Sequence, residues 1–131
     1  MDSQFARTAL LLGSDAIDKL EKCRVAIFGI GGVGGYVAEA LARSGIGAID
    51  LIDNDKISLS NLNRQIIATH STLGLDKVDV AKTRLLDINP KCDVRIYKTF
   101  FLPETQDDFD FKQYDYRSEE RRVGKECRSR W

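Results

Sequence analysis

The sequence lacks the features of a secreted or membrane-embedded protein. Its 131 residues include only three cysteines, which lie far apart and form no C-x-x-C pair, so neither a disulfide framework nor a zinc site is indicated. No apolar run approaches the ~18 residues that a membrane span needs, and no secretory signal precedes the first predicted helix. We therefore expect a cytoplasmic protein that does not associate with membranes.

The chain also lacks a net charge, and this balance hides a change in composition near its end. Residues 117–131 hold six Arg or Lys and three Glu, which leaves 14 basic and 17 acidic residues in the first 116. That mildly acidic body gives no argument for nucleic-acid binding from charge alone. The string RSEERRVGKECRSRW resembles the translation of a common sequencing-library adapter. We therefore expect a native part that ends at Tyr116, followed by a non-native, disordered tail.

Helical and strand-like patterns alternate along the native part. Apolar residues at helical spacing predict helices over 4–12, 14–22 and 76–88, and a further helix that starts after the glycines at 29–34 and stops before Gly45. Short apolar runs predict strands at 24–28 and 48–53, and alternating residues predict an edge strand at 93–99. In the helix after the glycines, Glu39 and Arg43 fall outside the apolar face. This order is typical of an α/β fold with a Rossmann-like, doubly wound, mainly parallel sheet, here truncated.

A glycine-rich turn follows the first predicted strand and opens a helix, with the sequence Gly29-Ile30-Gly31-Gly32-Val33-Gly34. Glycine allows such a turn to bring backbone N–H groups close to phosphate at the positive end of the helix dipole. Asp53 ends the next strand, where a carboxylate can accept hydrogen bonds from ribose hydroxyls. The alternative for the glycine turn is a role in packing only, and the alternative for Asp53 is a solvated loop carboxylate. At this point a nicotinamide site fits the residues as well as an ATP site does.

Polar side chains beyond Asp53 separate these two kinds of nucleotide site. Asn61, Arg64 and Gln65 follow it in the polar loop, and Lys77 opens the next helix. Polyphosphate binding uses such residues, because Arg and Lys neutralise phosphate oxygens while amide side chains fix their orientation. Hydride transfer requires no such set. The sequence therefore favours a triphosphate over a nicotinamide cofactor.

The ordered motifs resemble the ubiquitin-activating-enzyme-like adenylyltransferase family over about residues 4–116. The resemblance rests on D-x-D at 53–55, S-N-L-x-R-Q at 60–65, G-x-x-K at 74–77 and the Asn-Pro pair at 89–90. It implies ATP and Mg²⁺ as cofactors and catalytic roles for Arg64, Lys77 and Arg7. Arg7 matches an arginine that reaches the neighbouring subunit's ATP site in homodimers of the family, and an exposed helix residue is the alternative. The implied ATP-binding residues are Gly29, Gly31, Gly32, Gly34, Asp53, Asp55, Asn61, Arg64, Gln65 and Lys77.

Three stretches, 4–8, 63–72 and 87–90, resemble the tRNA threonylcarbamoyladenosine dehydratases within that family. This likeness implies a tRNA partner and ATP-dependent cyclisation of N6-threonylcarbamoyladenosine through an acyl-adenylate. Adenylation of the C-terminus of a ubiquitin-like or sulfur-carrier protein is one alternative, and an NAD-dependent oxidoreductase is another. Reaction at the α-phosphate needs no covalent protein nucleophile, and charge neutralisation by Mg²⁺, Arg and Lys would supply most of the acceleration.

The end of the native part leads to two further expectations. Members of the family continue past the position of Tyr116 into another strand and a loop whose Asp serves Mg²⁺. We therefore expect this chain by itself to lack adenylation activity. We also expect the strand at 24–28 to lose most of its outer neighbour and to become an exposed edge that favours aggregation.

Overall fold

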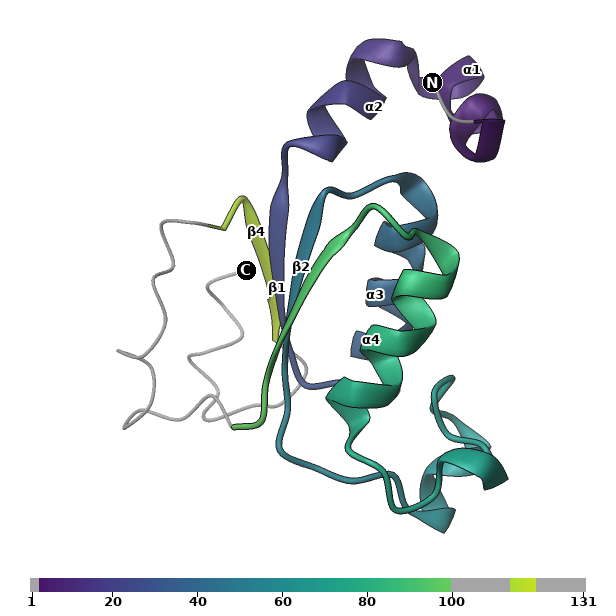
Figure 1. Ribbon diagram of the computed structural model, residues 1–131, viewed down its shortest axis with the longest axis vertical. Coiled ribbons are helices and arrows are strands. Elements are labelled where there is room, and N and C mark those ends of the chain that lie inside the picture. Colours follow the sequence, from purple (N-terminus) through teal and green to yellow (C-terminus); the bar gives the residue numbers. More distant parts are fainter. Residues whose placement is uncertain (1–2, 100–113, 120–131) are drawn as a thin grey trace.

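The computed structural model describes residues 3–99 and 114–119 (Figure 1). In chain order its elements are η1 (Ser3–Phe5), α1 (Ala6–Leu12), α2 (Ser14–Glu21), β1 (Arg24–Phe28), α3 (Gly34–Ser44), β2 (Ala48–Ile52), η2 (Leu59–Asn63), η3 (His70–Thr72), α4 (Lys77–Ile88), β3 (Asp93–Tyr97) and β4 (Tyr116–Glu119), where η denotes a 3₁₀ helix. The predicted helices and strands are confirmed to within two residues at their ends. The polar loop before α4 contains two 3₁₀ helices that the sequence analysis did not predict.

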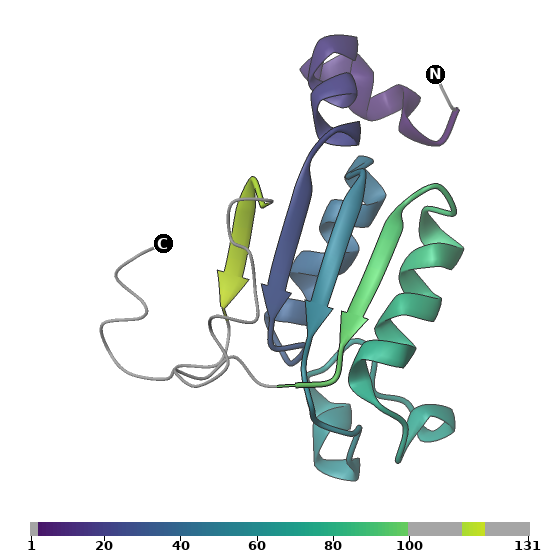
Figure 2. The same ribbon diagram turned by 60° about the vertical axis from the view of Figure 1, so that its left-hand side comes forward.

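The four strands form one parallel sheet in the order β3-β2-β1-β4. β1 pairs with β2 from Arg24↔Ala48 to Phe28↔Ile52, and β2 pairs over its full length with β3. Helices α3 and α4 cover the same face of this sheet (Figures 1 and 2). Right-handed crossovers that advance in one direction along a sheet place their helices in this way. The predicted α/β, Rossmann-like arrangement with β3 at an edge is therefore confirmed.

The outer side of β1 is occupied by β4, which corrects two predictions. The pairing runs from Val25↔Tyr116 to Phe28↔Glu119, so β1 is not an exposed edge. Two more hydrogen bonds join Arg24 to Asp115, each at 2.8 Å. The Arg24 N–H donates to Asp115 Oδ2, and the Asp115 N–H donates to the Arg24 carbonyl. Residues 117–119, predicted as part of a disordered tail, therefore belong to a strand. Backbone groups along β1 can pair with any extended segment, whatever side chains that segment carries.

The main hydrophobic core lies between the sheet and the helices α3 and α4. Nearly continuous apolar strands are expected where a parallel sheet is covered, and β1 and β2 show this pattern. Gly45 ends α3 in the left-handed conformation, with φ 98°. The residues that fill this core from strands and helices include Ile27, Ile49, Leu51, Ala38, Ala42, Val78 and Leu85.

Glu39 of α3 is buried in the contact between α3 and α4, although its spacing predicted a position outside the apolar face. Its carboxylate accepts hydrogen bonds from Arg84 Nε of α4 and from Arg43 Nη2, both at 2.8 Å. The hydrogen bond from Arg84 is the largest cause that lowers the pKa of Glu39, and Arg43 lowers it further. Two guanidinium groups thus compensate the burial of this carboxylate, which helix periodicity alone could not predict.

The lowered pKa of Glu39 makes its contribution to stability depend on pH. The folded protein holds the ionised carboxylate more tightly than the unfolded chain does, so this stabilisation is complete above the ordinary value of 4.5 and is lost as the pH falls through the lower folded value. Urea unfolding should therefore show that the wild type exceeds Glu39→Gln in free energy of unfolding by an amount that is constant near neutral pH. This difference should shrink as the pH falls below that range. A difference that stays constant down to the lowest pH at which both fold would contradict this assignment.

The sheet face away from α3 and α4 carries a buried ion pair. Asp50, in the middle of β2, is fully buried, and its Oδ1 lies 2.6 Å from Nη2 of Arg24. The Tyr114 hydroxyl donates to Asp50 Oδ2 at 2.6 Å. Burial, and then this hydrogen bond, raise the pKa of Tyr114. Asp50 thereby ties together β1, β2 and the segment that leads into β4.

Replacing Asp50 by alanine should destabilise the protein by about 3 kcal/mol, because it leaves the Arg24 guanidinium desolvated without its main partner. The matched control is Asp93→Ala, which removes a carboxylate that lies 3.4 Å from Arg24 and is 54% exposed. That variant should change the free energy of unfolding by less than about 0.5 kcal/mol. Equal decreases in the free energy of unfolding of the two variants would show that the buried ion pair stabilises the protein no more than the exposed one.

Candidate functional site

Asp53 joins the glycine turn after β1 to the end of β2. The Ile30 N–H donates to Asp53 Oδ2 at 2.7 Å, and the Asp55 N–H donates to Oδ1 at 2.8 Å. Gly29 begins the turn at φ 98°, a conformation that strongly favours glycine, and its N–H donates to the Ile52 carbonyl at 2.8 Å. Each carboxylate oxygen can accept more than one hydrogen bond. Asp53, which is 7% exposed, therefore fixes the turn and retains acceptor capacity for ligand hydroxyls.

The four predicted glycines, Gly29, Gly31, Gly32 and Gly34, lie in the connection from β1 to the start of α3. Because β1 ends at this edge of the sheet, the positive end of α3 lies beside Asp53, which favours an anionic group there. The next residue, Gly35, is buried, and a Cβ there would lie 3.3 Å from Ile66 Cγ2. The loop after β2 therefore packs closely against the start of α3.

Backbone pairing brings the start of α4 to the same edge of the sheet. The Lys77 N–H donates to the Asp55 carbonyl at 3.1 Å, and Lys56 forms an antiparallel bridge with Asp76. The Lys77 side chain is only 6% exposed. Among residues 3–99 and 114–119, no carboxylate pairs with its ammonium group. An ammonium group that no carboxylate neutralises can pair with an anionic ligand, so a phosphate would be stabilised at this position.

Helix η2 positions the three remaining predicted residues. Asn61 is buried, and its Oδ1 accepts a hydrogen bond from the Ser58 N–H at 2.9 Å, which closes a capping box. Arg64 is exposed and donates through Nη1 to the Ser60 carbonyl at 3.1 Å and to Asn63 Oδ1 at 2.9 Å. Gln65 is 7% exposed, and its Oε1 finds no hydrogen-bond partner in the described part of the chain. Buried polar atoms of this kind need explanation, and a bound ligand supplies one.

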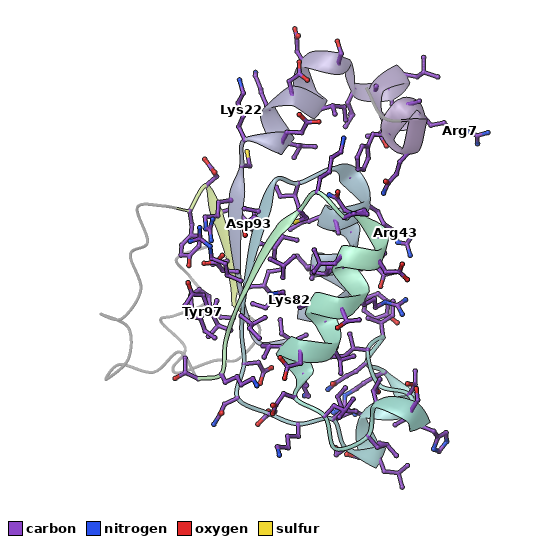
Figure 3. The ribbon with its side chains drawn as sticks, viewed as in Figure 1. Arg7, Lys22, Arg43, Lys82, Asp93 and Tyr97 are labelled. Carbon is purple, nitrogen blue, oxygen red and sulfur yellow. The ribbon has the colours of Figure 1, made fainter. Side chains whose placement is uncertain are left out.

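The structure therefore gathers most of the predicted site at the carboxyl edge of the sheet, with one exception. Gly29, Asp53, Asp55 and Lys77 are linked through the hydrogen bonds above, and η2 follows in the same loop. Arg7 lies on α1, at the opposite end of the molecule, and its side chain points away from the body (Figure 3). The role of the Ile30 backbone was not predicted from the sequence, although its place inside the glycine turn is a signal for it.

The described residues contain neither a candidate metal site nor a helix that could span a membrane. No three His, Cys, Asp or Glu side chains within 3–99 and 114–119 gather in a way that could hold a metal ion. In the same part of the chain, every helix is too short or too polar to cross a membrane.

Fold and site together define a Rossmann-like α/β domain with a polar cluster at the carboxyl edge of its parallel sheet. The model of the ThiF family matches residues 4–116, and the chain belongs to that family. This finding confirms the resemblance to ubiquitin-activating-enzyme-like adenylyltransferases that the motifs indicated.

Several of the proteins that this chain is similar to are tRNA threonylcarbamoyladenosine dehydratases. Over 113 residues, the chain is 46% identical to the tRNA threonylcarbamoyladenosine dehydratase of Bacillus subtilis. The aligned part is 86% of this chain and 43% of that protein. The Escherichia coli dehydratase in complex with ATP superposes with a TM-score of 0.89 at 36% identity, covering 97% of this chain and 55% of that one. The complex of the same dehydratase with AMP superposes with a TM-score of 0.84 at 41% identity. That match covers 87% of this chain and 46% of the dehydratase chain. The chain thus spans about half the length of these relatives.

Proposed function

We propose that this chain supplies the ATP-binding part of a tRNA threonylcarbamoyladenosine dehydratase. The observation that carries the proposal is Lys77, a largely buried residue whose ammonium has no carboxylate partner in the described part of the chain and whose backbone N–H donates to the Asp55 carbonyl near the glycine turn. A triphosphate provides the anionic oxygens that this group needs. The similarity to a dehydratase whose crystal structure holds ATP supports the same assignment.

Each residue of the cluster has a role that its position allows. The glycine turn and the start of α3 would hold phosphates through backbone N–H groups, and Asp53 would accept hydrogen bonds from ribose hydroxyls. Lys77 and Arg64 would neutralise phosphate charge once Arg64 leaves its contacts on η2. Asn61, Gln65 and Asp55 would orient the nucleotide. Mg²⁺ binds largely through phosphates and water, so we propose that it enters with ATP rather than through a separate protein site.

The chemistry explains why a dehydration would use ATP. The threonyl carboxylate of the modified adenosine is a poor acyl donor, because an oxide ion would have to leave. Attack of this carboxylate on the α-phosphorus expels pyrophosphate and creates a better leaving group. The carbamoyl group then closes the ring as AMP departs, and one water is lost overall. Cations at the phosphates stabilise the charge that develops during the first step, which is the contribution expected of Lys77 and Arg64.

Two further parts of the proposal concern partners and location. We propose a homodimer, in which Arg7 reaches the ATP site of the partner subunit; its outward position on α1 leaves it available for that role. A tRNA substrate also implies a cytoplasmic location.

A chimera tests the proposed function. Residues 4–116 of this chain would replace the matching part of the Bacillus subtilis relative, and nucleoside mass spectrometry would follow threonylcarbamoyladenosine in tRNA with ATP and Mg²⁺. We expect the cyclic product, one water lighter, and expect its loss when the chimera carries Lys77→Ala. A folded chimera that binds ATP and adenylates a sulfur-carrier protein, but leaves the tRNA nucleoside unchanged, would refute the proposal in favour of the alternative adenylyltransferase.

A further inference from the structure

Glu39 is the one long side chain that helix α3 buries. The other buried residues of this helix, Gly34, Gly35, Ala38 and Ala42, carry at most a methyl group. α3 packs against α4. Small side chains form shallow ridges, so helices that meet through them approach closely but interlock little. Apolar packing therefore fixes the position of α3 along α4 less firmly than large side chains would.

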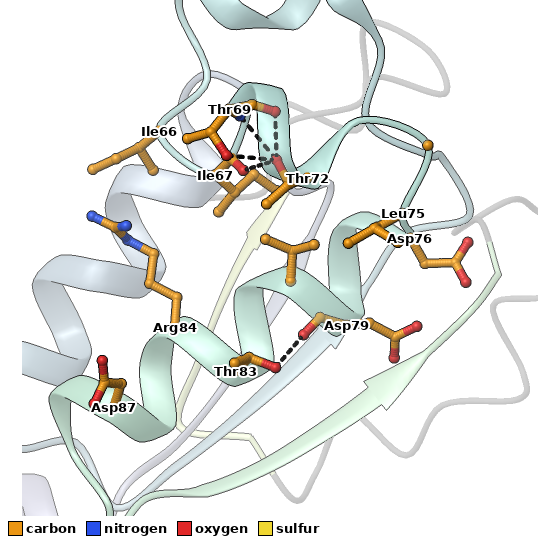
Figure 4. Close-up of a pocket in the computed structure, with 12 residues that line it drawn as sticks. Ile66, Ile67, Thr69, Thr72, Leu75, Asp76, Asp79, Thr83, Arg84 and Asp87 are labelled. Atoms are coloured by element: carbon orange, nitrogen blue, oxygen red, sulfur yellow. Dashed lines mark hydrogen bonds between the residues drawn. The ribbon is translucent and has the colours of Figure 1, made fainter.

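A groove next to α4 leaves Arg84 free of close packing on one side. The groove has a volume of about 530 Å³, and its lining includes Val80 and Arg84 of α4 and Ile66 of the loop after η2 (Figure 4). The side chain of Arg84 is accordingly 41% exposed. Its orientation is therefore determined less by apolar neighbours than by its polar contact with α3.

That contact is a two-pronged ion pair with Glu39. Arg84 extends from α4 towards α3 (Figure 4), and its Nε donates to Glu39 Oε2 at 2.8 Å while its Nη2 donates to Oε1 at 3.3 Å. Two parallel hydrogen bonds between planar groups fix both their distance and their orientation. Arg43 donates to the same carboxylate at 2.8 Å, but it belongs to α3 itself. Of the two guanidinium groups, that of Arg84 alone joins α3 to α4.

The two helices that this pair joins both begin at the candidate site. Gly34 opens α3 at the end of the glycine turn, and Lys77 opens α4. Glu39 and Arg84 each lie within about two turns of these helix ends. A helix is stiff over so short a length. The ion pair therefore sets the separation between the glycine turn and Lys77.

We propose that Glu39 and Arg84 are positioning residues, which hold the glycine turn and Lys77 at the separation that one triphosphate spans. Neither residue touches the nucleotide. A ligand that uses both helix ends at once depends on this separation, because binding groups have to be held to within about 0.5 Å of their productive places. Adenosine carries no phosphate and does not depend on it. The inference rests on the proposed function, since it takes the ligand to be ATP.

Arg84→Met tests the inference, because it keeps most of the side-chain length and removes the guanidinium. Calorimetry should show ATP with Mg²⁺ binding at least ~10-fold more weakly than to the wild type. Titration with adenosine, followed by NMR, should show an affinity that changes by less than about twofold. Arg43→Met is the matched control, since it removes a guanidinium at the same 2.8 Å from the same carboxylate and also leaves Glu39 one partner. It should change both affinities by less than about twofold.

A second pair of variants keeps the test valid if Arg84→Met does not fold. Arg84→Lys retains the charge without the two-pronged geometry, so its ATP affinity should fall between those of the wild type and Arg84→Met, whereas Arg43→Lys should match the wild type. Unchanged ATP affinity in the Arg84 variants, an equal loss in the Arg43 variants, or a parallel loss of ATP and adenosine binding would each overturn the inference. If the wild type binds ATP through Lys77 in any of these cases, the proposed function stands without it. A wild type that binds no ATP would refute both.

Discussion

Lys77→Ala is expected to weaken ATP binding at least ~100-fold, which corresponds to about 2.7 kcal/mol. Lys77 is only 6% exposed at the carboxyl edge of the sheet, where a phosphate would pair with its ammonium group. Removal of one member of a buried, charge-assisted contact costs that much or more. Isothermal titration calorimetry of the chain with ATP and Mg²⁺ measures the effect directly.

Two controls separate a binding role from a structural one. Lys82→Ala removes another lysine of α4 and should change ATP affinity by less than about twofold, because Lys82 lies outside the cluster (Figure 3). Lys77→Met keeps most of the side-chain volume and removes the charge. Without nucleotide its free energy of unfolding should lie within about 1 kcal/mol of the wild-type value, since the lost ammonium has no carboxylate partner within residues 3–99 and 114–119. Unchanged ATP affinity in Lys77→Ala would contradict the assignment of the site.

Gly47→Ala is expected to have the largest effect on stability, about 4 kcal/mol or more. A Cβ at this position would lie 1.9 Å from the carbonyl oxygen of Glu21 and 2.6 Å from its carbonyl carbon. Both are backbone atoms at the end of α2, so no side-chain rotation can relieve the clash. The Gly47 N–H also donates to the Leu20 carbonyl at 2.9 Å, and its carbonyl accepts from the Asp93 N–H at 2.9 Å. Any shift would disturb both the α2 connection and the start of β3.

Gly13→Ala is the matched control for this substitution. Gly13 adopts φ 89°, but a Cβ there meets no atom within 4 Å. Its cost should therefore be limited to backbone strain of about 1–3 kcal/mol, because φ 89° with ψ 153° is a conformation that almost only glycine adopts. Thermal and urea unfolding of both variants would compare the two effects. Similar decreases in the free energy of unfolding of the two variants would mean that the backbone at Gly47 and α2 can move apart at little cost, which would contradict the prediction.

Sequence patterns predicted the elements whose stability depends on local spacing. The apolar runs of β1 and β2 and the helical spacing of α4 determine which faces are buried, so their limits followed to within two residues. The glycine turn and Asp53 were also predictable, because a turn between a strand and a helix brings its backbone to the edge of the sheet. Even the link from the turn to Asp53 agrees with the expected position of a carboxylate at a strand end.

Interactions between distant segments were not predictable in this way. Asp50 is buried because Arg24 and Tyr114 reach it from other segments, and Glu39 is buried because Arg84 does so from α4. The partners lie 26 to 64 residues from these carboxylates in sequence, so no local pattern reveals them. The pairing of β4 with β1 depends on backbone groups, and the side chains of residues 117–119 gave no signal for a strand.

The most direct measurement is a calorimetric titration of the chain with ATP and Mg²⁺ beside a titration with NAD under the same conditions. A polar cluster arranged for a triphosphate should give saturable ATP binding, at least ~10-fold tighter than NAD, that disappears in Lys77→Ala. Tighter binding of NAD, or ATP binding that does not depend on Lys77, would contradict the identification of this edge of the sheet as an ATP site.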